Sequence, residues 1–206
     1  YKRQSGVWGH AMSPECQVTM FEREFAEYYD VGYAITTTSG STALEVALRA
    51  VAVGPGDEVI TPALTWVAPQ LAAVMVGADP VFVDVKPATY CLDPSGVEAA
   101  ITPRTKAIMP VLLFGQCANM LAISDIAKRH GLYVIEDAAQ AFCSSLNGKR
   151  AGAFSQSAAF SMNPMKILHA YGEAGAVTTN NKKVYNKIKQ MRHAGTKRDK
   201  AGKHIN

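Results

Sequence analysis

Short apolar segments with strand-like composition alternate with amphipathic, helix-like segments along most of this 206-residue chain. This alternation is typical of βαβ units, in which helices connect parallel strands and cover the faces of the sheet. We therefore expect an α/β fold, a mostly parallel sheet of about seven strands with helices on both faces. Strands are expected at residues 33–37, 58–61, 81–85, 105–113, 133–137, 158 onward and 175–179, and helices at 17–29, 43–53, 65–76, 93–100, 120–130 and 183–193.

Two of the expected strands lead into residues that suit a pyridoxal phosphate site. Residues 134–140 (VIEDAAQ) run from apolar side chains into a carboxylate, so Asp137 is expected at the carboxyl end of a buried strand, where α/β sheets bind ligands. The strand from residue 158 leads into a proline-containing loop that ends at Lys166. A lysine forms the Schiff base with this cofactor, and an acid pairs with the protonated pyridine nitrogen. The ordinary alternatives are a helix-capping or loop acid at Asp137 and a solvated surface lysine at Lys166.

Three further features could contact such a cofactor. Residues 38–42 (TSGST), with Ser41 and Thr42, join a strand to a helix, and their N–H groups and hydroxyls suit a phosphate. A plain N-cap is the alternative, and the standard nucleotide-binding glycine motifs are absent from the sequence. Trp66 could stack on a planar ring or pack in a core or interface. Gln140 could bond the phenolic oxygen or be solvated at a helix start.

Composition narrows the partners and the compartment. The net charge of +4 does not by itself indicate a nucleic-acid partner. The basic segment 180–206 could be a solvated helix face or could face the diphosphate of a nucleotide substrate. The four cysteines are far apart, without a C-x-x-C pair, which favours a reducing, cytoplasmic location. No apolar run in the sequence is long enough to span a membrane, and the histidines have no metal-ligand spacing.

Several segments together resemble the DegT/DnrJ/StrS-type pyridoxal-phosphate-dependent nucleotide-sugar aminotransferase family. The resemblance extends from about residue 21 to residue 179, and the order and spacing of the segments make it specific. The matching segments are SGSTAL at 39–44, GPGDEVITP at 54–62, TWV at 65–67, PVFVDV at 80–85, ITPRTKAI at 101–108, VIEDAAQA at 134–141 and FSMNPMKILHAYGEAG at 160–175.

The resemblance implies a fold-type-I aminotransferase large domain and a role for each site residue. Lys166 would form the Schiff base and shuttle a proton between the imine carbons, and Asp137 would keep the pyridine nitrogen protonated. The other implied cofactor contacts are Gln140 at the phenolic oxygen, Trp66 on the ring, and Ser41, Thr42 and Ser161 at the phosphate.

The resemblance also implies an aminotransferase that moves an amino group from glutamate (or glutamine) to a nucleotide-linked keto-sugar. The setting would be cell-surface polysaccharide or antibiotic-sugar biosynthesis, and the enzyme would be a homodimer with its active site at the interface. Residues 1–206 would be the cofactor-binding large domain, incomplete and without the small C-terminal domain. Leu112 stands where the family usually has histidine, which leaves the sugar open. The alternatives are a sugar dehydratase of the same family, a group that tends to carry histidine at the position of Lys166, and a non-catalytic regulatory or assembly relative.

Overall fold

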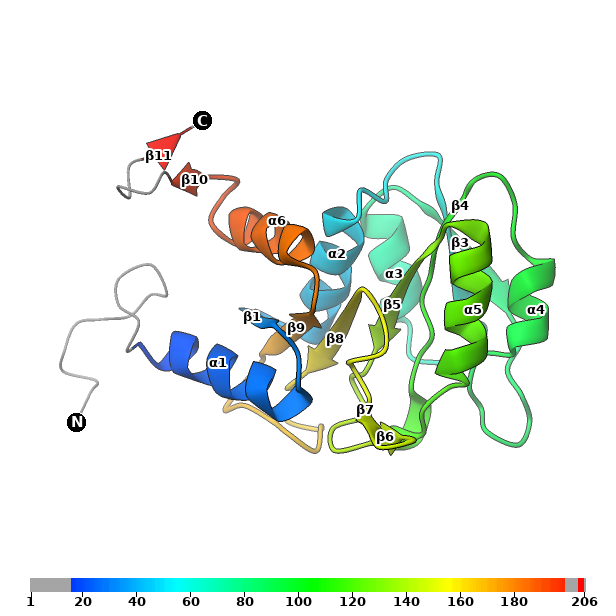
Figure 1. Ribbon diagram of the computed structural model, residues 1–206, viewed down its shortest axis with the longest axis horizontal. Helices are drawn as coiled ribbons and strands as arrows, with labels where there is room; N and C mark the ends of the chain where they lie inside the picture. Colours follow the sequence, from blue (N-terminus) through cyan, green and yellow to red (C-terminus); the bar gives the residue numbers. More distant parts are fainter. Residues whose placement is uncertain (1–15, 199–203, 206) are drawn as a thin grey trace.

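The computed structural model describes residues 16–198, 204 and 205. The polar composition of residues 1–13 predicts an arm, which lies outside the described residues. A seven-stranded sheet forms its centre (Figure 1). Its strands are β1 (Tyr33–Thr37), β2 (Glu58–Pro62), β3 (Asp79–Val83), β4 (Thr105–Ile108), β5 (Tyr133–Asp137), β8 (Ser157–Ser161) and β9 (Gly175–Thr179). Two small hairpins add β6 (Ser145–Leu146) with β7 (Lys149–Arg150), and β10 (Lys197–Arg198) with β11 (His204–Ile205).

The strand order is β1-β9-β8-β5-β4-β2-β3, and neighbouring strands are parallel except at β9. Because β9 is antiparallel to both of its neighbours, all six other strands point the same way and share one carboxyl edge. This confirms the expected mostly parallel α/β sheet. Strands β2 and β9 are buried throughout, as expected for strands covered on both faces.

Helices cover both faces of the sheet (Figure 1), which confirms the expected layering. The helices are α1 (Gln17–Tyr29), α2 (Gly40–Ala50), α3 (Ala68–Met75), α4 (Pro94–Ala99), α5 (Met120–His130) and α6 (Lys182–Arg192). One apolar cluster joins the sheet to α1, α4 and α5, and a second joins it to α2, α3 and α6. None of the helices within residues 16–198 is long and apolar enough to cross a membrane.

Several element boundaries differ from the expected ones. The helix expected at residues 43–53 is α2 at 40–50, and two of the other differences involve proline. The strand expected over residues 105–113 ends at Ile108, and the chain continues through Pro110, which lacks an N–H for the ladder, to the short 3-10 helix η2 (Leu113–Gly115). The helix expected from residue 65 begins only at Ala68, with Pro69 in its first turn, so Trp66 lies in the preceding loop. The strand expected at 81–85 is β3, and its pairing with β2 ends at Val83 because β2 itself ends there.

Candidate active site at the carboxyl edge

The sequence-predicted residues come from segments that leave the same edge of the sheet. Asp137 is the last residue of β5, and Ser161 is the last residue of β8. The loops after β1, β2 and β8 carry the serine-threonine segment, Trp66 and Lys166. Since these strands are parallel, their carboxyl ends lie together, at the edge where ligands of open α/β sheets bind.

Asp137 is a buried carboxyl group with few hydrogen-bond donors. Its side chain accepts one hydrogen bond, from the backbone N–H of Ala139 at 3.0 Å, and the residue is 5% exposed. Burial raises the pKa of Asp137 to about 6, while the Ala139 N–H and the positive charge of Lys166 oppose the rise. A buried acid that lacks donors is suited to a cationic N–H group placed against it.

Lys166 lies in the loop between β8 and β9 and is half-buried. Asn163 shapes this loop, because its Oδ1 accepts the N–H of Met165 at 2.9 Å and its backbone oxygen accepts the N–H of Lys166 at 2.8 Å. The Asn163 amide also donates to Glu173. None of the salt bridges among the described residues involves Lys166. Its positive charge opposes the rise in the pKa of Asp137.

The first turn of α2 packs directly against the end of β8. A Cβ on Gly40 would lie 2.6 Å from the Cβ of Ser161, so only glycine permits this approach. Ser39 caps the helix, because its Oγ accepts the N–H of Thr42 at 3.1 Å. The N-cap expected as an alternative therefore exists, but Ser39 provides it, and Ser41 is exposed at the same helix end.

Gln140 and Trp66 lie on loops at this edge. The Gln140 Oε1 accepts the backbone N–H of Phe114 at 2.9 Å, which orients the side chain and leaves the NH₂ end for other partners. Trp66 is 71% exposed and lies two residues before α3. This exposure rules out the core-packing alternative for Trp66 within the described chain.

Glu136 is fully buried beside Asp137 on β5 and was not among the residues predicted from the sequence. Its carboxylate accepts hydrogen bonds from the backbone N–H groups of Gly152, Phe154 and Ser155, at 2.7, 2.9 and 3.0 Å, and from the Ser155 hydroxyl at 2.8 Å. Burial raises the pKa of Glu136, and these donors oppose the rise. The sequence did contain a signal for Glu136, namely two consecutive acids in an apolar strand. Successive side chains of a strand face opposite sides of the sheet, so the two acids enter different surroundings.

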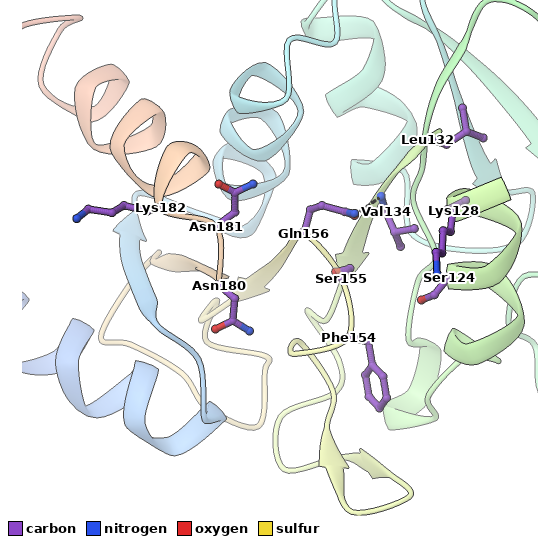
Figure 2. A pocket seen from close by; sticks show the side chains of 11 residues that line it. Ser124, Lys128, Leu132, Val134, Phe154, Ser155, Gln156, Asn180, Asn181 and Lys182 are labelled. Carbon is purple, nitrogen blue, oxygen red and sulfur yellow. Dashed lines mark hydrogen bonds between the residues drawn. The ribbon is translucent and has the colours of Figure 1, made fainter. Parts of the chain in front are cut away.

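A cavity of about 670 Å³ lies at the opposite edge of the sheet. Figure 2 shows it between Ser124 and Lys128 of α5 on one side and Ser155 and Gln156, just before β8, on the other. Asn180, which directly follows β9, also lines it, and none of the sequence-predicted site residues does. The cavity and the residues that suit a cofactor therefore lie at opposite edges of the sheet. We place the candidate active site at the carboxyl edge, because Asp137, Lys166 and the contact of Gly40 with Ser161 are there.

Comparison with known proteins identifies relatives of the same organisation. The profile of the DegT/DnrJ/EryC1/StrS aminotransferase family matches residues 8–206. The chain is 47% identical to a UDP-2-acetamido-2-deoxy-3-oxo-D-glucuronate aminotransferase of Pseudomonas aeruginosa, over 92% of this chain and 52% of that protein. It is 48% identical to a pleiotropic regulatory protein of Geobacillus stearothermophilus, over 87% of this chain and 48% of that protein.

Solved structures agree with this family assignment. The X-ray crystal structure of DesV from S. venezuelae matches with a TM-score of 0.87 at 44% identity, covering 90% of this chain and 50% of that one. The chain therefore spans about half the length of the relatives it matches. The matching structures include a putative sugar aminotransferase in its PLP form and a protein with bound PMP. By its sequence and its fold, the chain belongs to the DegT/DnrJ/EryC1/StrS aminotransferase family, whose members depend on pyridoxal phosphate.

Proposed function

We propose that this chain is the cofactor-binding large domain of a nucleotide-sugar aminotransferase. The enzyme would move an amino group from glutamate (or glutamine) to the ketone of a nucleotide-linked sugar, in cell-surface polysaccharide or antibiotic-sugar biosynthesis. The observation that carries the proposal is the buried, donor-poor Asp137 with Lys166 close enough to affect its pKa. Relatives named as aminotransferases of UDP- and dTDP-linked sugars support the substrate class.

The residues at the carboxyl edge fit pyridoxal phosphate. Asp137 has a single backbone donor, so the protonated pyridine nitrogen would supply the missing positive partner and favour the ionised carboxylate. The contact of Gly40 with Ser161 leaves no room for a Cβ and brings the positive end of the α2 dipole to the end of β8, as a phosphate site requires. Ser41, Thr42 and Ser161 would hold the phosphate there.

Pyridoxal phosphate, when bound, supplies an aldehyde that captures amines and a ring that accepts electrons. Lys166 would anchor the aldehyde and, once the donor amine displaces it, move a proton between the two carbons that exchange the amino group. Asp137 would keep the pyridine nitrogen protonated. The NH₂ group of Gln140 would donate to the phenolic oxygen, and Trp66 would cover one face of the ring. The donor would leave as a keto acid, and the sugar oxygen would leave as water.

Replacement of Lys166 by alanine tests the proposal directly. We expect borohydride to fix one cofactor on the Lys166 peptide of the full-length wild-type enzyme, and Lys166→Ala to lose this label and the amine transfer. Mass spectrometry of the reduced protein and a transfer assay over a panel of nucleotide keto-sugars measure both. Lys128→Ala on α5 is the matched control, because Lys128 lines the cavity at the opposite edge. A label that persists in Lys166→Ala would overturn the assignment.

A second candidate function is a regulatory role without catalysis, which the identity to the pleiotropic regulatory protein favours. A purified full-length protein that folds but takes up no reducible cofactor would support this function over the transferase. Lys166 argues against the dehydratase alternative, which tends to have histidine at this position. The homodimer, the cytoplasmic location and the absence of nucleic-acid and membrane partners stay predictions.

A further inference from the structure

A largely buried ion pair joins the two helices that flank the edge strand β1. Glu22 of α1 is 6% exposed and pairs with Arg192, the last residue of α6. Both side chains bond to Thr36 of β1. The Glu22 carboxylate accepts the Thr36 backbone N–H at 2.7 Å and its hydroxyl at 2.8 Å, and Arg192 Nη1 donates to the Thr36 hydroxyl at 3.0 Å and carbonyl at 3.3 Å.

This arrangement supplies hydrogen-bond partners to Thr36 on the outer edge of the sheet. Within the described part of the chain, β1 is the terminal strand of the sheet, and its ladder partner is β9. Backbone groups on the outer edge of such a strand need other partners when they are buried. The Thr36 N–H and carbonyl find theirs in Glu22 and Arg192, so the ion pair fixes the backbone at this point of β1 from both helices.

Thr36 lies immediately upstream of the loop that leads into α2. The other side of this loop is held by two close backbone contacts: Gly40 packs on Ser161, and a Cβ on Gly175 would overlap the carbonyl of Ser39. Thr37 adds a hydrogen bond from its hydroxyl to the Ser39 carbonyl at 2.9 Å. The loop is therefore held downstream by β8 and β9 and upstream by the ion pair.

The ion pair is not built for stability alone. Buried ion pairs can often be replaced by apolar side chains without loss of stability. Here Arg192 Nη2 is also buried without a hydrogen-bond partner among the described residues, which adds a desolvation cost. Stability therefore does not explain this charged network. The geometry that it imposes on Thr36, next to the loop into α2, does.

We propose that Glu22 and Arg192 are positioning residues for the cofactor phosphate. By holding Thr36, they set where the first turn of α2 presents Ser41 and Thr42. This inference depends on the proposed function, because the phosphate is that of pyridoxal phosphate. Charge-assisted hydrogen bonds are short and directional, so a small displacement of this turn weakens them, whereas the pyridine ring is held elsewhere, at Asp137.

The test compares pyridoxal phosphate with pyridoxal, which lacks the phosphate, in binding titrations of the full-length protein. Glu22→Gln and Arg192→Met should weaken pyridoxal phosphate binding about tenfold, the loss expected for one misplaced charge-assisted hydrogen bond. Pyridoxal binding should stay within about twofold, since no phosphate contact is at stake. Arg192→Lys keeps the charge and should restore part of the loss.

Glu58→Gln is the matched control. Glu58 is also buried, pairs with Arg104 and accepts the Thr102 hydroxyl, but it begins β2 at the amino edge of the sheet. Its loss should lower thermal stability without changing the ratio of the two affinities.

The inference would be overturned if Glu22→Gln left the ratio of the two affinities unchanged, whether or not both fell. It would also be overturned if Glu58→Gln changed the ratio by the same amount. If Glu22→Gln does not fold, the same ratio of affinities is measured in Arg192→Lys and Arg192→Met. A wild-type protein that binds neither compound would instead contradict the proposed function.

Discussion

Two neighbouring carboxyl groups on β5 occupy different surroundings. Glu136 extends to the side of the sheet where the loop at residues 152–155 supplies four hydrogen-bond donors to its two oxygens. Asp137, at the carboxyl edge, receives one donor, and its pKa is raised to about 6 by burial. Both groups are almost inaccessible to solvent. Burial alone therefore does not distinguish Glu136 from Asp137, the acid proposed to bind the cofactor.

The number of donors does distinguish them. A buried carboxylate whose lone pairs are satisfied has a complete structural role, and removing it leaves buried N–H groups without acceptors. A buried carboxyl group that lacks donors has capacity for a charged partner from outside the chain. We therefore expect substitutions at the two positions to affect different properties: activity at Asp137 and stability at Glu136.

The largest expected effect is the loss of catalysis in Asp137→Asn. In the proposed site, the Asp137 carboxylate is the anionic partner of the pyridine nitrogen, and without it we expect the rate of each half-reaction to fall about a thousandfold. Single-turnover kinetics with the amine donor and with the keto-sugar measure this. The variant should stay folded, because the amide removes a buried acid rather than a saturated network. Near wild-type turnover in this variant would contradict the proposed functional role of Asp137.

Glu136→Ala should be the most destabilising of these substitutions. It removes the acceptor of three backbone N–H groups in the 152–155 loop, of which that of Gly152 is buried, and we expect a loss of about 3–5 kcal/mol in the free energy of unfolding. Urea denaturation measures the loss. Glu136→Gln, which keeps one oxygen acceptor, should lose less. If Glu136→Ala is as stable as Asp137→Asn, the number of hydrogen-bond donors does not determine how much each acid contributes to stability.

The raised pKa of Asp137 predicts a pH dependence of stability in the cofactor-free protein. Its ordinary value is 3.8, and the folded value is about 6, so the folded protein holds this proton more tightly than the unfolded chain. The resulting stabilisation is present below pH about 4 and is lost as the pH rises through about 6, by about 3 kcal/mol.

The comparison with Asp137→Asn isolates this contribution, because the amide does not titrate. We expect the stability of Asp137→Asn relative to wild type to increase between pH 4 and pH 7. Thermal or urea unfolding at both pH values measures the difference. A difference that is the same at both pH values would show that Asp137 titrates normally.

The smallest expected effect is that of Trp66→Leu. Because Trp66 is 71% exposed, its loss should change stability by no more than about 0.5 kcal/mol. A ring stacked on the cofactor would contribute about 1 kcal/mol to binding, a roughly fivefold change in affinity. Leu71→Ala on α3, also exposed, is the control and should change neither. Unchanged cofactor affinity in Trp66→Leu would show that Trp66 does not contact the cofactor and would limit the proposed site to the surroundings of Asp137.

Much of the fold followed from local sequence. The helix at residues 17–29 and the strands at 33–37 and 175–179 have the predicted bounds, because apolar periodicity directly reflects which side chains an element buries. The boundaries near Pro69 and Pro110 were harder to place, since proline removes a backbone donor within otherwise favourable apolar segments. The placement of Asp137 at a strand end also followed from sequence, because strand length and the apolar run before it locate the edge.

The sequence by itself thus determined the α/β class, the strand that ends at Asp137 and the resemblance that singles out Lys166. Only the tertiary structure decided which of two adjacent buried acids has a single donor, since the donors to Glu136 come from a loop at residues 152–155. It also decided that Gly40 lies against Ser161 and that Glu22 meets Arg192, 170 positions away. Such pairings depend on how the chain returns across the sheet, and no local pattern encodes that path.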